Sequence, residues 1–274
     1  MSDTTTWELL VVTEGTQNAS TDNGKIYASL VGKDSSGNQV TSPDVKLDND
    51  NTNEFRKGYV DTFVDIYTFD STSSLTHLKL RSDSGDKWCV HRVYLTNMTT
   101  GKIWKTKVSS WLEKQSISFE VEEFNSDSDS TISTDVFNIK IHTSTQNTSG
   151  SNNKVFIKLI SQDGIASESI HLNELGNNWT EGSTYNHRHP ISRHLSRIDH
   201  VLLFKDGQQG WFPDQVTISA AEGLEGQLLV TTQANNTEKL NGKENGLRNL
   251  VELNLEKIQQ QDQNIEEKAA ELSN

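Results

Sequence analysis

Short apolar runs alternate with polar clusters along most of the chain. Between about residues 7 and 232, runs such as WELLVV, KIYASLV, FVDIYTF and WCVHRVYL are separated by stretches rich in glycine, asparagine, aspartate and serine. Apolar runs of this length, bounded by turn-forming residues, are typical of β-strands. Only three prolines occur, and no long helical period appears before residue 240. The pattern therefore predicts an all-β fold of the sandwich or barrel kind.

The strand pattern occurs twice. KIYASL is matched 129 residues later by KVFIKL, each with a lysine, a β-branched residue, an aromatic residue and a final leucine. Two further spacings recur in the same order, from an aromatic residue to a glycine and from an aspartate to a tryptophan. These landmarks are Phe55, Gly58, Asp83 and Trp88 in the first copy, and Trp179, Gly182, Asp206 and Trp211 in the second. Their offsets of 123 to 129 residues predict two tandem units.

The repeat defines the expected domain boundaries. We expect the first unit at 5–115 and a second, more divergent unit at 135–233. Between them, 116–134 contains the acidic, serine-rich sequence EVEEFNSDSDSTIST, which is typical of a linker.

Residues 242–273 have an apolar residue at every seventh position, which predicts an amphipathic C-terminal α-helix. The stripe consists of Val251, Ile258, Ile265 and Leu272. The companion heptad positions hold polar residues, which makes a weak coiled-coil seam. Three interpretations stay open: a solvated helix lying on a domain, a helix that joins copies of the chain through residues 247–272, and a membrane-surface helix. The glutamates of its polar face disfavour anionic lipid.

Composition and charge narrow the classes of function. The chain has 274 residues, of which 32% are hydrophobic, and a formal net charge of −13. A surface this acidic repels nucleic acid, and it repels anionic membranes unless a cation or a local basic cluster intervenes. The single cysteine, Cys89, excludes an intrachain disulfide, so the fold depends on its apolar core.

Targeting and catalytic motifs are not recognised in the sequence. The start, MSDTTTWELLVV, lacks the basic region and long apolar stretch of a secretory signal peptide. The longest apolar runs, LLVV and VLLF, are far shorter than the ~20 residues that span a bilayer. We therefore expect a cytoplasmic or peripheral-membrane protein without a transmembrane segment. Motifs of hydrolases, phosphate-binding loops and zinc proteases do not occur, so we expect no enzyme activity.

Three stretches of the first unit resemble PLAT (lipoxygenase homology) domains. STDNGKIYASLVG is similar to the loop and second strand of the family, and NEFRKGYVDTF resembles its Phe-x-x-Gly-x-x-Asp-x-Phe stretch. LTHLKLRSDSGDKWCVHRVYL resembles its Leu-x-x-Leu-x-Leu strand, acidic loop and tryptophan. The resemblance covers residues 7–112 and implies two eight-stranded antiparallel β-sandwiches. It also implies docking onto lipid, a membrane or a protein, sometimes through calcium. A C2-like sandwich is the competing interpretation, and NEFRKGYVDTF favours PLAT.

Acidic loops of the first unit are candidates for calcium binding. Calcium takes roughly six to eight oxygen ligands, which loops meeting at one end of a sandwich can supply. By resemblance to the family, the expected ligands are Asp22, Asn53, Glu54, Asp83 and Asp86. The competing interpretation is that aspartate and asparagine occur here because they favour turns. The second unit has Ser151 where Asp22 would align, so calcium is not expected there.

The strand that follows Gly58 carries an unusual pair of aspartates. Strand alternation places Asp61, Phe63 and Asp65 on one face and the valines on the other. Gly58 supplies a turn that residues with side chains resist. By resemblance, Asp61 occupies the acidic position of the family, where we expect it to anchor the preceding loop by hydrogen bonds.

The second unit contains a cluster of basic and histidine side chains. The sequence HRHPISRHLSRIDH, at 187–200, holds four of the eight histidines and three arginines against one aspartate. It predicts a patch for an anionic headgroup or an acidic partner, formed by His187, Arg188, His189, Arg193 and Arg197. A transition-metal site and an ordinary solvated strand are alternatives, and no nearby cysteine or paired carboxylate completes a metal site.

Together these features predict a non-catalytic binding module. The first hypothesis is docking on lipid headgroups or a membrane surface, assisted by calcium in the first unit. The alternative is a protein-binding or structural adaptor that assembles through the C-terminal helix. Trp88, Trp179 and Trp211 align with framework positions and are expected in the core, so deep membrane insertion is not expected.

Overall fold

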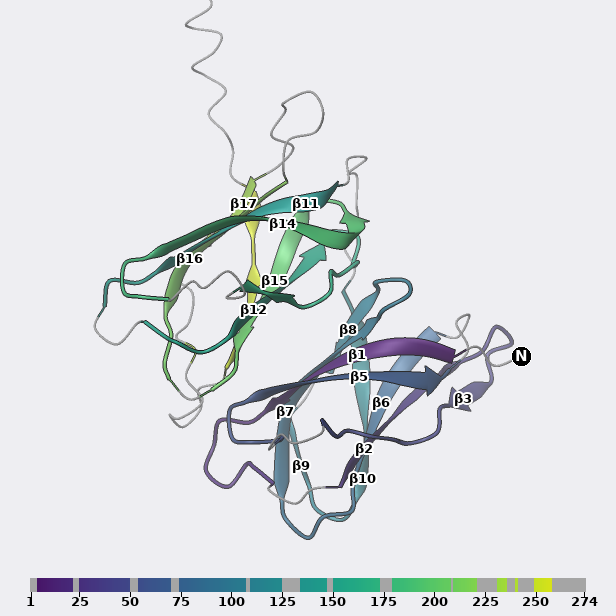
Figure 1. The fold of residues 1–274 in the computed structure, drawn as a ribbon. Helices are drawn as coiled ribbons and strands as arrows, with labels where there is room; N and C mark the ends of the chain where they lie inside the picture. Colours follow the sequence, from purple (N-terminus) through teal and green to yellow (C-terminus); the bar gives the residue numbers. More distant parts are fainter. Residues whose placement is uncertain are drawn as a thin grey trace, which may run out of the picture.

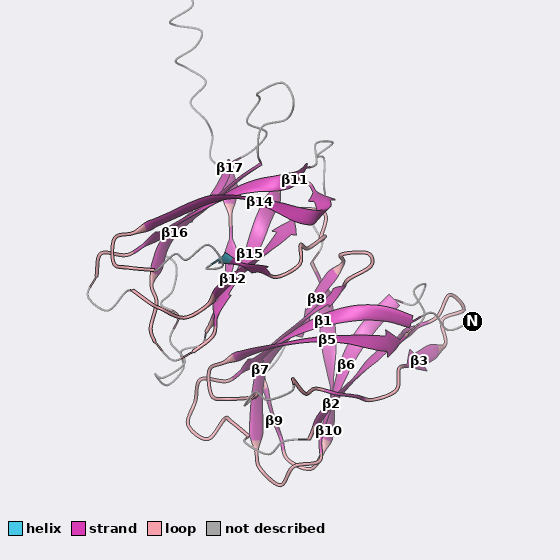
Figure 2. Ribbon diagram, in the orientation of Figure 1, coloured by secondary structure: helices cyan, strands magenta, loops and turns pink. Residues whose placement is uncertain are grey.

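The protein consists almost entirely of β-strands and loops (Figure 1; Figure 2). The computed structural model describes residues 4–21, 25–49, 54–69, 74–106, 109–124, 134–146, 150–172, 179–207, 209–220, 231–235, 240 and 249–257. Within these ranges the strands form two β-sandwiches, one after the other along the chain. The all-β prediction is therefore confirmed. No helix in the same ranges has the length and apolar character needed to cross a membrane.

Within the described residues the first sandwich contains ten antiparallel strands, two more than the expected eight. One sheet has the order β5-β1-β7-β8-β10 with β9 beside β7, and the other has the order β10-β6-β2-β3 with β4 beside β2. β10 belongs to both sheets, since it pairs with β6 and with β8. The strands are β1 (Thr4–Thr13), β2 (Ile26–Lys33), β3 (Gln39–Thr41), β4 (Val45–Lys46), β5 (Val60–Thr68), β6 (Ser74–Ser82), β7 (Trp88–Asn97), β8 (Ile103–Thr106), β9 (Ser110–Leu112) and β10 (Ser116–Glu123).

The second sandwich repeats this plan with two separate sheets. One sheet has the order β14-β11-β16-β17-β19 and the other the order β13-β12-β15-β18. The strands are β11 (Thr134–Thr143), β12 (Val155–Ser161), β13 (Ile170–His171), β14 (Thr184–Leu195), β15 (Ile198–Lys205), β16 (Pro213–Ala220), β17 (Thr231–Asn235), β18 (Leu250–Asn254) and β19 (Glu256–Lys257).

Corresponding strands and side chains confirm the repeat. The arrangement β5-β1-β7 recurs as β14-β11-β16, and the pair β2-β6 recurs as β12-β15. The indole N–H of Trp88 donates to Thr13 at 3.1 Å, and that of Trp211 donates to Thr143 at 3.2 Å. Both tryptophans are fully buried, as is Trp179, so the prediction that these three lie in the core is confirmed.

The two sandwiches pack against each other through an apolar interface. The outer faces of β1, β7 and β8 meet the outer faces of β12 and β15, and their buried side chains form one cluster. From the first sandwich the cluster takes Leu10, Val12, Tyr94, Ile103 and Phe124, and from the second Ile160, Ala166, Leu202 and Phe204. Each of these central strands is consequently buried on both faces. This explains why WELLVV and VLLF are continuous apolar runs and not alternating ones.

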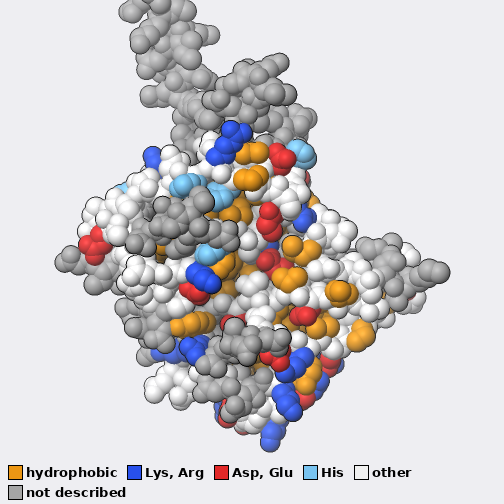
Figure 3. Space-filling model, in the orientation of Figure 1, with side chains coloured by type: hydrophobic (Ala, Val, Ile, Leu, Met, Phe, Trp, Pro, Cys, Tyr) orange, Lys and Arg blue, Asp and Glu red, His pale blue; other side chains and the backbone are white. Residues whose placement is uncertain are grey.

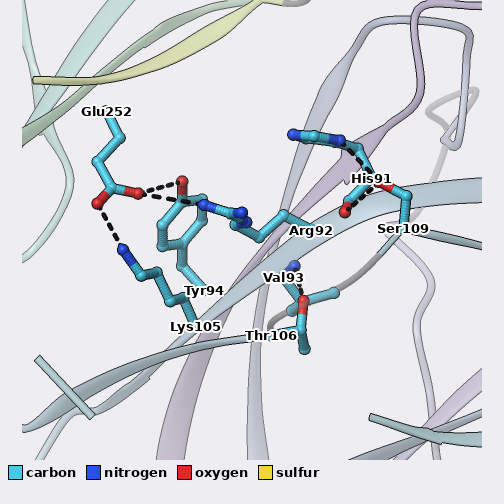
Figure 4. A network of polar contacts seen from close by, with 8 residues as sticks. All are labelled: His91, Arg92, Val93, Tyr94, Lys105, Thr106, Ser109 and Glu252. Carbon is cyan, nitrogen blue, oxygen red and sulfur yellow. Dashed lines mark hydrogen bonds and ion pairs between the residues drawn. The ribbon is translucent and has the colours of Figure 1, made fainter. Parts of the chain in front are cut away.

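Polar contacts complete the interface between the sandwiches. Glu252 on β18 accepts hydrogen bonds from the Tyr94 hydroxyl at 3.0 Å and from Lys105 at 2.7 Å, with Arg92 at 3.5 Å (Figure 4). The backbone N–H of Asn249 donates to the carbonyl of Gly58 at 2.7 Å. Because Glu252 meets three partners of the other sandwich, this network orients the two units relative to each other.

Two predicted boundaries are wrong. Residues 116–123, expected in the linker, form β10, whose Phe119 is buried in the first core. Residues 250–257, expected within the C-terminal helix, form β18 and β19. Only Val251 of the seven-residue stripe lies in this stretch. The stretch is apolar on both faces, since Val251 and Leu253 lie in the second core and Leu250 packs on the interface. The remainder of the expected helix, 258–273, lies outside the described residues.

Candidate functional site

Three loops of the first sandwich meet at one of its ends. They connect β1 to β2, β4 to β5 and β6 to β7, and they contain the residues predicted to bind calcium. Backbone hydrogen bonds join them, from the N–H of Thr21 to the carbonyl of Phe55 at 3.2 Å and from that of Asp83 to the carbonyl of Lys25 at 3.0 Å. The loops therefore form one connected surface, which we call the loop end.

Asp61, on β5, holds the loop between β4 and β5 in place. Its carboxylate accepts a hydrogen bond from the backbone N–H of Phe55 at 2.8 Å, as the sequence predicted. The pKa of Asp61 is raised to about 7, chiefly by burial and also by the nearby charge of Glu54, while the hydrogen bond from Phe55 opposes the rise. Gly58 adopts a φ of 72°, which closes the turn between Phe55 and the start of β5 and which residues with a Cβ avoid.

The structure describes three of the five residues predicted to bind calcium: Glu54, Asp83 and Asp86. Asp22 and Asn53 lie outside the described residues. The carboxylate of Glu54 accepts a hydrogen bond from the backbone N–H of Asn49 at 2.9 Å, so it is engaged within its own loop. Asp86 is exposed, and its backbone N–H donates to the hydroxyl of Ser84 at 3.0 Å.

Arg81 neutralises one predicted ligand. Its guanidinium forms ion pairs with Asp83 and, at 2.7 Å, with Asp44, and it lies 4.1 Å above the ring of Tyr27. Across the described ranges, no group of three acidic, histidine or cysteine side chains is arranged to hold a metal. A calcium ion that recruited Asp83 would have to compete with Arg81.

Trp111 is a feature of the loop end that the sequence analysis missed. Of six tryptophans, five are buried and Trp111 is 43% exposed. It lies on β9, where Leu112 points into the core and Trp111 therefore points outward. The alternation in SSWL could have revealed this orientation, but the prediction for tryptophans covered only Trp88, Trp179 and Trp211.

Exposed lysines flank Trp111. The turn after β9 contacts the loop between β6 and β7, since the N–H of Lys114 donates to the carbonyl of Ser84 at 3.2 Å. Lys87, on the same loop, lies 3.5 Å from the carboxylate of Glu113. Both lysine side chains are exposed. The loop end thus presents an exposed aromatic ring on β9, with two exposed lysines at the adjoining turn and loop.

The basic cluster of the second sandwich does not form one patch. On the face drawn in Figure 3, histidines gather over this sandwich. His187 and His189 lie on the inner side of β14, where both rings contact Tyr185 and where burial lowers the pKa of His189. Arg188 points the opposite way and is exposed.

The other two arginines of the predicted patch lie elsewhere. Arg193 donates to the carbonyl of Met98 in the first sandwich at 2.9 Å, so it belongs to the interface between the units. Arg197 lies in the turn between β14 and β15, where its carbonyl accepts the N–H of Gln162 at 2.8 Å. The expected convergence of five basic and histidine side chains is therefore wrong, because strand alternation and the interface separate them.

Comparison with known proteins identifies the class of both sandwiches. The family model of the PLAT/LH2 domain matches residues 7–124 and 137–263. These two matches cover most of the chain, which therefore belongs to the PLAT/LH2 family and carries two such domains in tandem. None of the curated proteins matches the chain.

Similar solved structures are lipoxygenases. One is a LOX variant in complex with arachidonate, at 13% identity over 44% of this chain, with a TM-score of 0.35. Another is coral 8R-lipoxygenase, whose structure is described as showing calcium activation via a C2-like domain, at 20% identity over 42% of this chain, with a TM-score of 0.36. The matches span 16% and 17% of those chains. We draw no functional conclusion from likenesses at this level.

Proposed function

We propose that the chain is a non-catalytic module that docks on lipid surfaces through the loop end of its first PLAT domain, assisted by calcium. The observation that carries the proposal is the exposure of Trp111 on β9, next to the turn and loop that hold the exposed Lys114 and Lys87. An indole ring is apolar with one polar N–H, and it partitions to the boundary between headgroups and acyl chains. Lysines beside it attract anionic headgroups and keep their charge in water.

Calcium has a defined role in this proposal. The chain carries a net charge of −13, which opposes approach to an anionic bilayer. A calcium ion among the acidic loops would reduce this repulsion and bridge carboxylates to phosphates. Glu54, Asp83 and Asp86 are the described candidates, and Asp22 and Asn53 complete the proposed set.

The packing of the second domain on the first supports docking by the loop end rather than by the flat face of a sheet. The outer faces of β1, β7 and β8 are covered by the second domain, so they are closed to a flat surface. The loop end meets the second domain at Gly58, whose carbonyl accepts the N–H of Asn249, and it presents Trp111 to solvent. The second domain therefore covers one sheet of the first domain and leaves Trp111 at the loop end exposed.

Co-sedimentation with liposomes tests the proposed function. Wild-type protein is mixed with phosphatidylcholine–phosphatidylserine vesicles in calcium or in chelator, beside Trp111→Ser and the double variant Asp83→Asn, Asp86→Asn. Val64→Ser, which removes an exposed apolar side chain of β5, is the matched control. We expect calcium-enhanced binding that Trp111→Ser abolishes, that the aspartate variant makes calcium-independent, and that Val64→Ser leaves unchanged.

Two results would count against the proposal. Absence of binding to any vesicle by folded wild-type protein would exclude lipid docking and direct attention to protein partners. Binding that is equal in calcium and chelator would retain the role of Trp111 and the lysines, and would remove calcium from the mechanism.

A further inference from the structure

β5 is the outermost strand of its sheet and leaves part of its backbone without a strand partner. In the part of the chain that the structure describes, β5 pairs only with β1. The N–H of Thr13 donates to the carbonyl of Tyr59, so odd-numbered residues of β5 bond to β1 and even-numbered ones face the free edge. The side-chain amide of Asn49 donates to the carbonyl of Thr62 at 2.9 Å, which covers the beginning of this edge. Among the residues that the structure describes, no strand pairs with this edge beyond that point, at Val64, Ile66 and Thr68.

The same residues carry an exposed apolar strip. Val64 is 58% exposed and Ile66 is 65% exposed. Val64 lies directly opposite Glu8 on β1, which places it on the face of the sheet that packs against the second domain. Val60, on the same face of β5, contacts the cluster between the domains. The strip is therefore a continuation of an established interface beyond the point where the second domain covers it.

The second domain shows how the corresponding edge is protected. β14 occupies the place of β5, and its register with β11 makes Arg188 equivalent to Val64 and Pro190 equivalent to Ile66. Arg188 and Pro190 are both exposed, and the amide of Pro190 faces the free edge without a hydrogen to donate. Charged residues and proline at these positions are established devices against strand addition. The first domain has neither device.

The sequence of the open edge is self-complementary. Residues 62–68 read TFVDIYT, which is nearly the same in chemical character when read backwards. In an antiparallel pair of two such strands centred on Asp65, threonine opposes threonine, Val64 opposes Ile66, and Phe63 opposes Tyr67. Val64 of one copy and Ile66 of the other would then exchange hydrogen bonds across the new boundary, through backbone groups that β1 does not use.

We propose that β5 is a homodimerisation edge, at which two copies of the chain pair antiparallel about a two-fold axis through Asp65. The pairing joins the two β5-containing sheets into one and covers Val64 and Ile66 of each copy with those of the other. Such an isologous contact uses the same patch on both copies, and it closes after two. The occupant is a second copy because the strand complements itself and its outer face carries no charge.

Asp65 limits the strength of this contact. Its carboxylate would lie opposite that of the other copy, and like charges directly opposite each other destabilise a strand pair. The net charge of −13 on each chain adds long-range repulsion. The dimer should therefore be reversible and favoured by salt, and Asp65→Asn should strengthen it.

Sedimentation velocity of the full chain tests the proposal. We expect wild type to convert from the 30.7 kDa monomer to a species of twice that mass as its concentration rises toward ~100 μM. Val64→Arg copies the protective residue of the second domain, and Ile66→Pro copies its proline. Both change exposed side chains and an amide that β1 does not use, and circular dichroism confirms that each variant is folded. Trp111→Ser is the control for a general loss of exposed apolar surface.

The expected result is a monomer for Val64→Arg and for Ile66→Pro, a dimer for Trp111→Ser, and a dimer at least several-fold tighter for Asp65→Asn. A wild-type chain that stays monomeric throughout, or a dimer that survives Val64→Arg, would overturn the proposal. A dimer that is lost on Val64→Arg but is unaffected by Asp65→Asn would overturn the register centred on Asp65.

Discussion

Glu8 on β1 and Lys158 on β12 form a buried ion pair that joins the two PLAT domains. The Lys158 side chain is fully buried, that of Glu8 is 5% exposed, and the ammonium also donates to the carbonyl of Ser167 at 2.8 Å. Burial lowers the pKa of Lys158, and the Glu8 carboxylate opposes this shift. A buried charge without its partner is costly, so the pair specifies how the domains dock more than it adds net stability.

Removal of one partner should be strongly destabilising. Lys158→Met leaves the Glu8 carboxylate buried and unpaired, which should lower the free energy of unfolding by about 3–5 kcal/mol. Urea denaturation measures the loss. The double variant Glu8→Leu, Lys158→Met removes both charges and should recover most of it. A single variant as stable as wild type would show that the pair is not buried in solution.

The domain interface should make unfolding cooperative. Leu202 faces the first domain and not the core of its own, so Leu202→Asp places a charge in the interface and leaves both cores intact. Wild type should unfold in one calorimetric transition, and the variant should unfold in two. Thr41→Asp, at an exposed position on β3 in the other sheet of the first domain, serves as a control that should keep a single transition. Two transitions in wild type would contradict a stable interface.

Asp61 should make the protein less stable as the pH rises. Its pKa is about 7 in the folded chain and near the ordinary 3.8 when unfolded. The folded state therefore binds the proton more tightly, and this contribution to stability is complete below about pH 4 and is lost as the pH rises to about 7. Across roughly three pH units the loss is at most ~4 kcal/mol.

Asp61→Asn isolates this effect. The amide oxygen still accepts the N–H of Phe55, and the side chain carries no charge. The variant should match wild type near about pH 4 and exceed it above about pH 7 by up to ~4 kcal/mol, measured by urea denaturation at each pH. A difference between the two proteins that does not change with pH would show that Asp61 is not desolvated.

Arg81 should oppose calcium binding at the loop end. Arg81→Gln frees the carboxylates of Asp83 and Asp44 from their shared cation. We expect calcium affinity to rise several-fold by isothermal titration calorimetry, because two anionic oxygens become available. Arg188→Gln, an exposed arginine of the other domain, is the matched control. Equal affinity in wild type and Arg81→Gln would place the calcium site, if one is measured, away from Asp83.

The repeat and the strands could be predicted from the sequence because they follow local rules, whereas the hydrogen bond of Asp61 was expected from the resemblance to the family. Strand alternation and turn residues act over a few positions, and both domains repeat them in order. The interface could not be predicted in this way, since it depends on which sheet faces meet. The sequence did contain one sign of the interface, the continuous apolar runs WELLVV and VLLF, whose strands are buried on both faces.

The errors have the same origin. The basic cluster was predicted from nearness along the chain, but alternation sends Arg188 outward and His187 inward, and the interface takes Arg193. Residues 250–257 were included in the predicted helix on the strength of Val251 alone, the only member of the seven-residue stripe that lies among them. In both cases, contacts with segments distant in the sequence determined the structure, and a single sequence does not show which segments meet.

Tryptophan fluorescence on vesicles with brominated acyl chains tests the central claim most directly. Because five of six tryptophans are buried, Trp111 dominates any response to the membrane. The account predicts a blue shift and quenching on phosphatidylserine-containing vesicles in calcium, both absent in Trp111→Phe when its own spectrum is the reference. Binding to the vesicles with no quenching of Trp111 would contradict docking through the loop end.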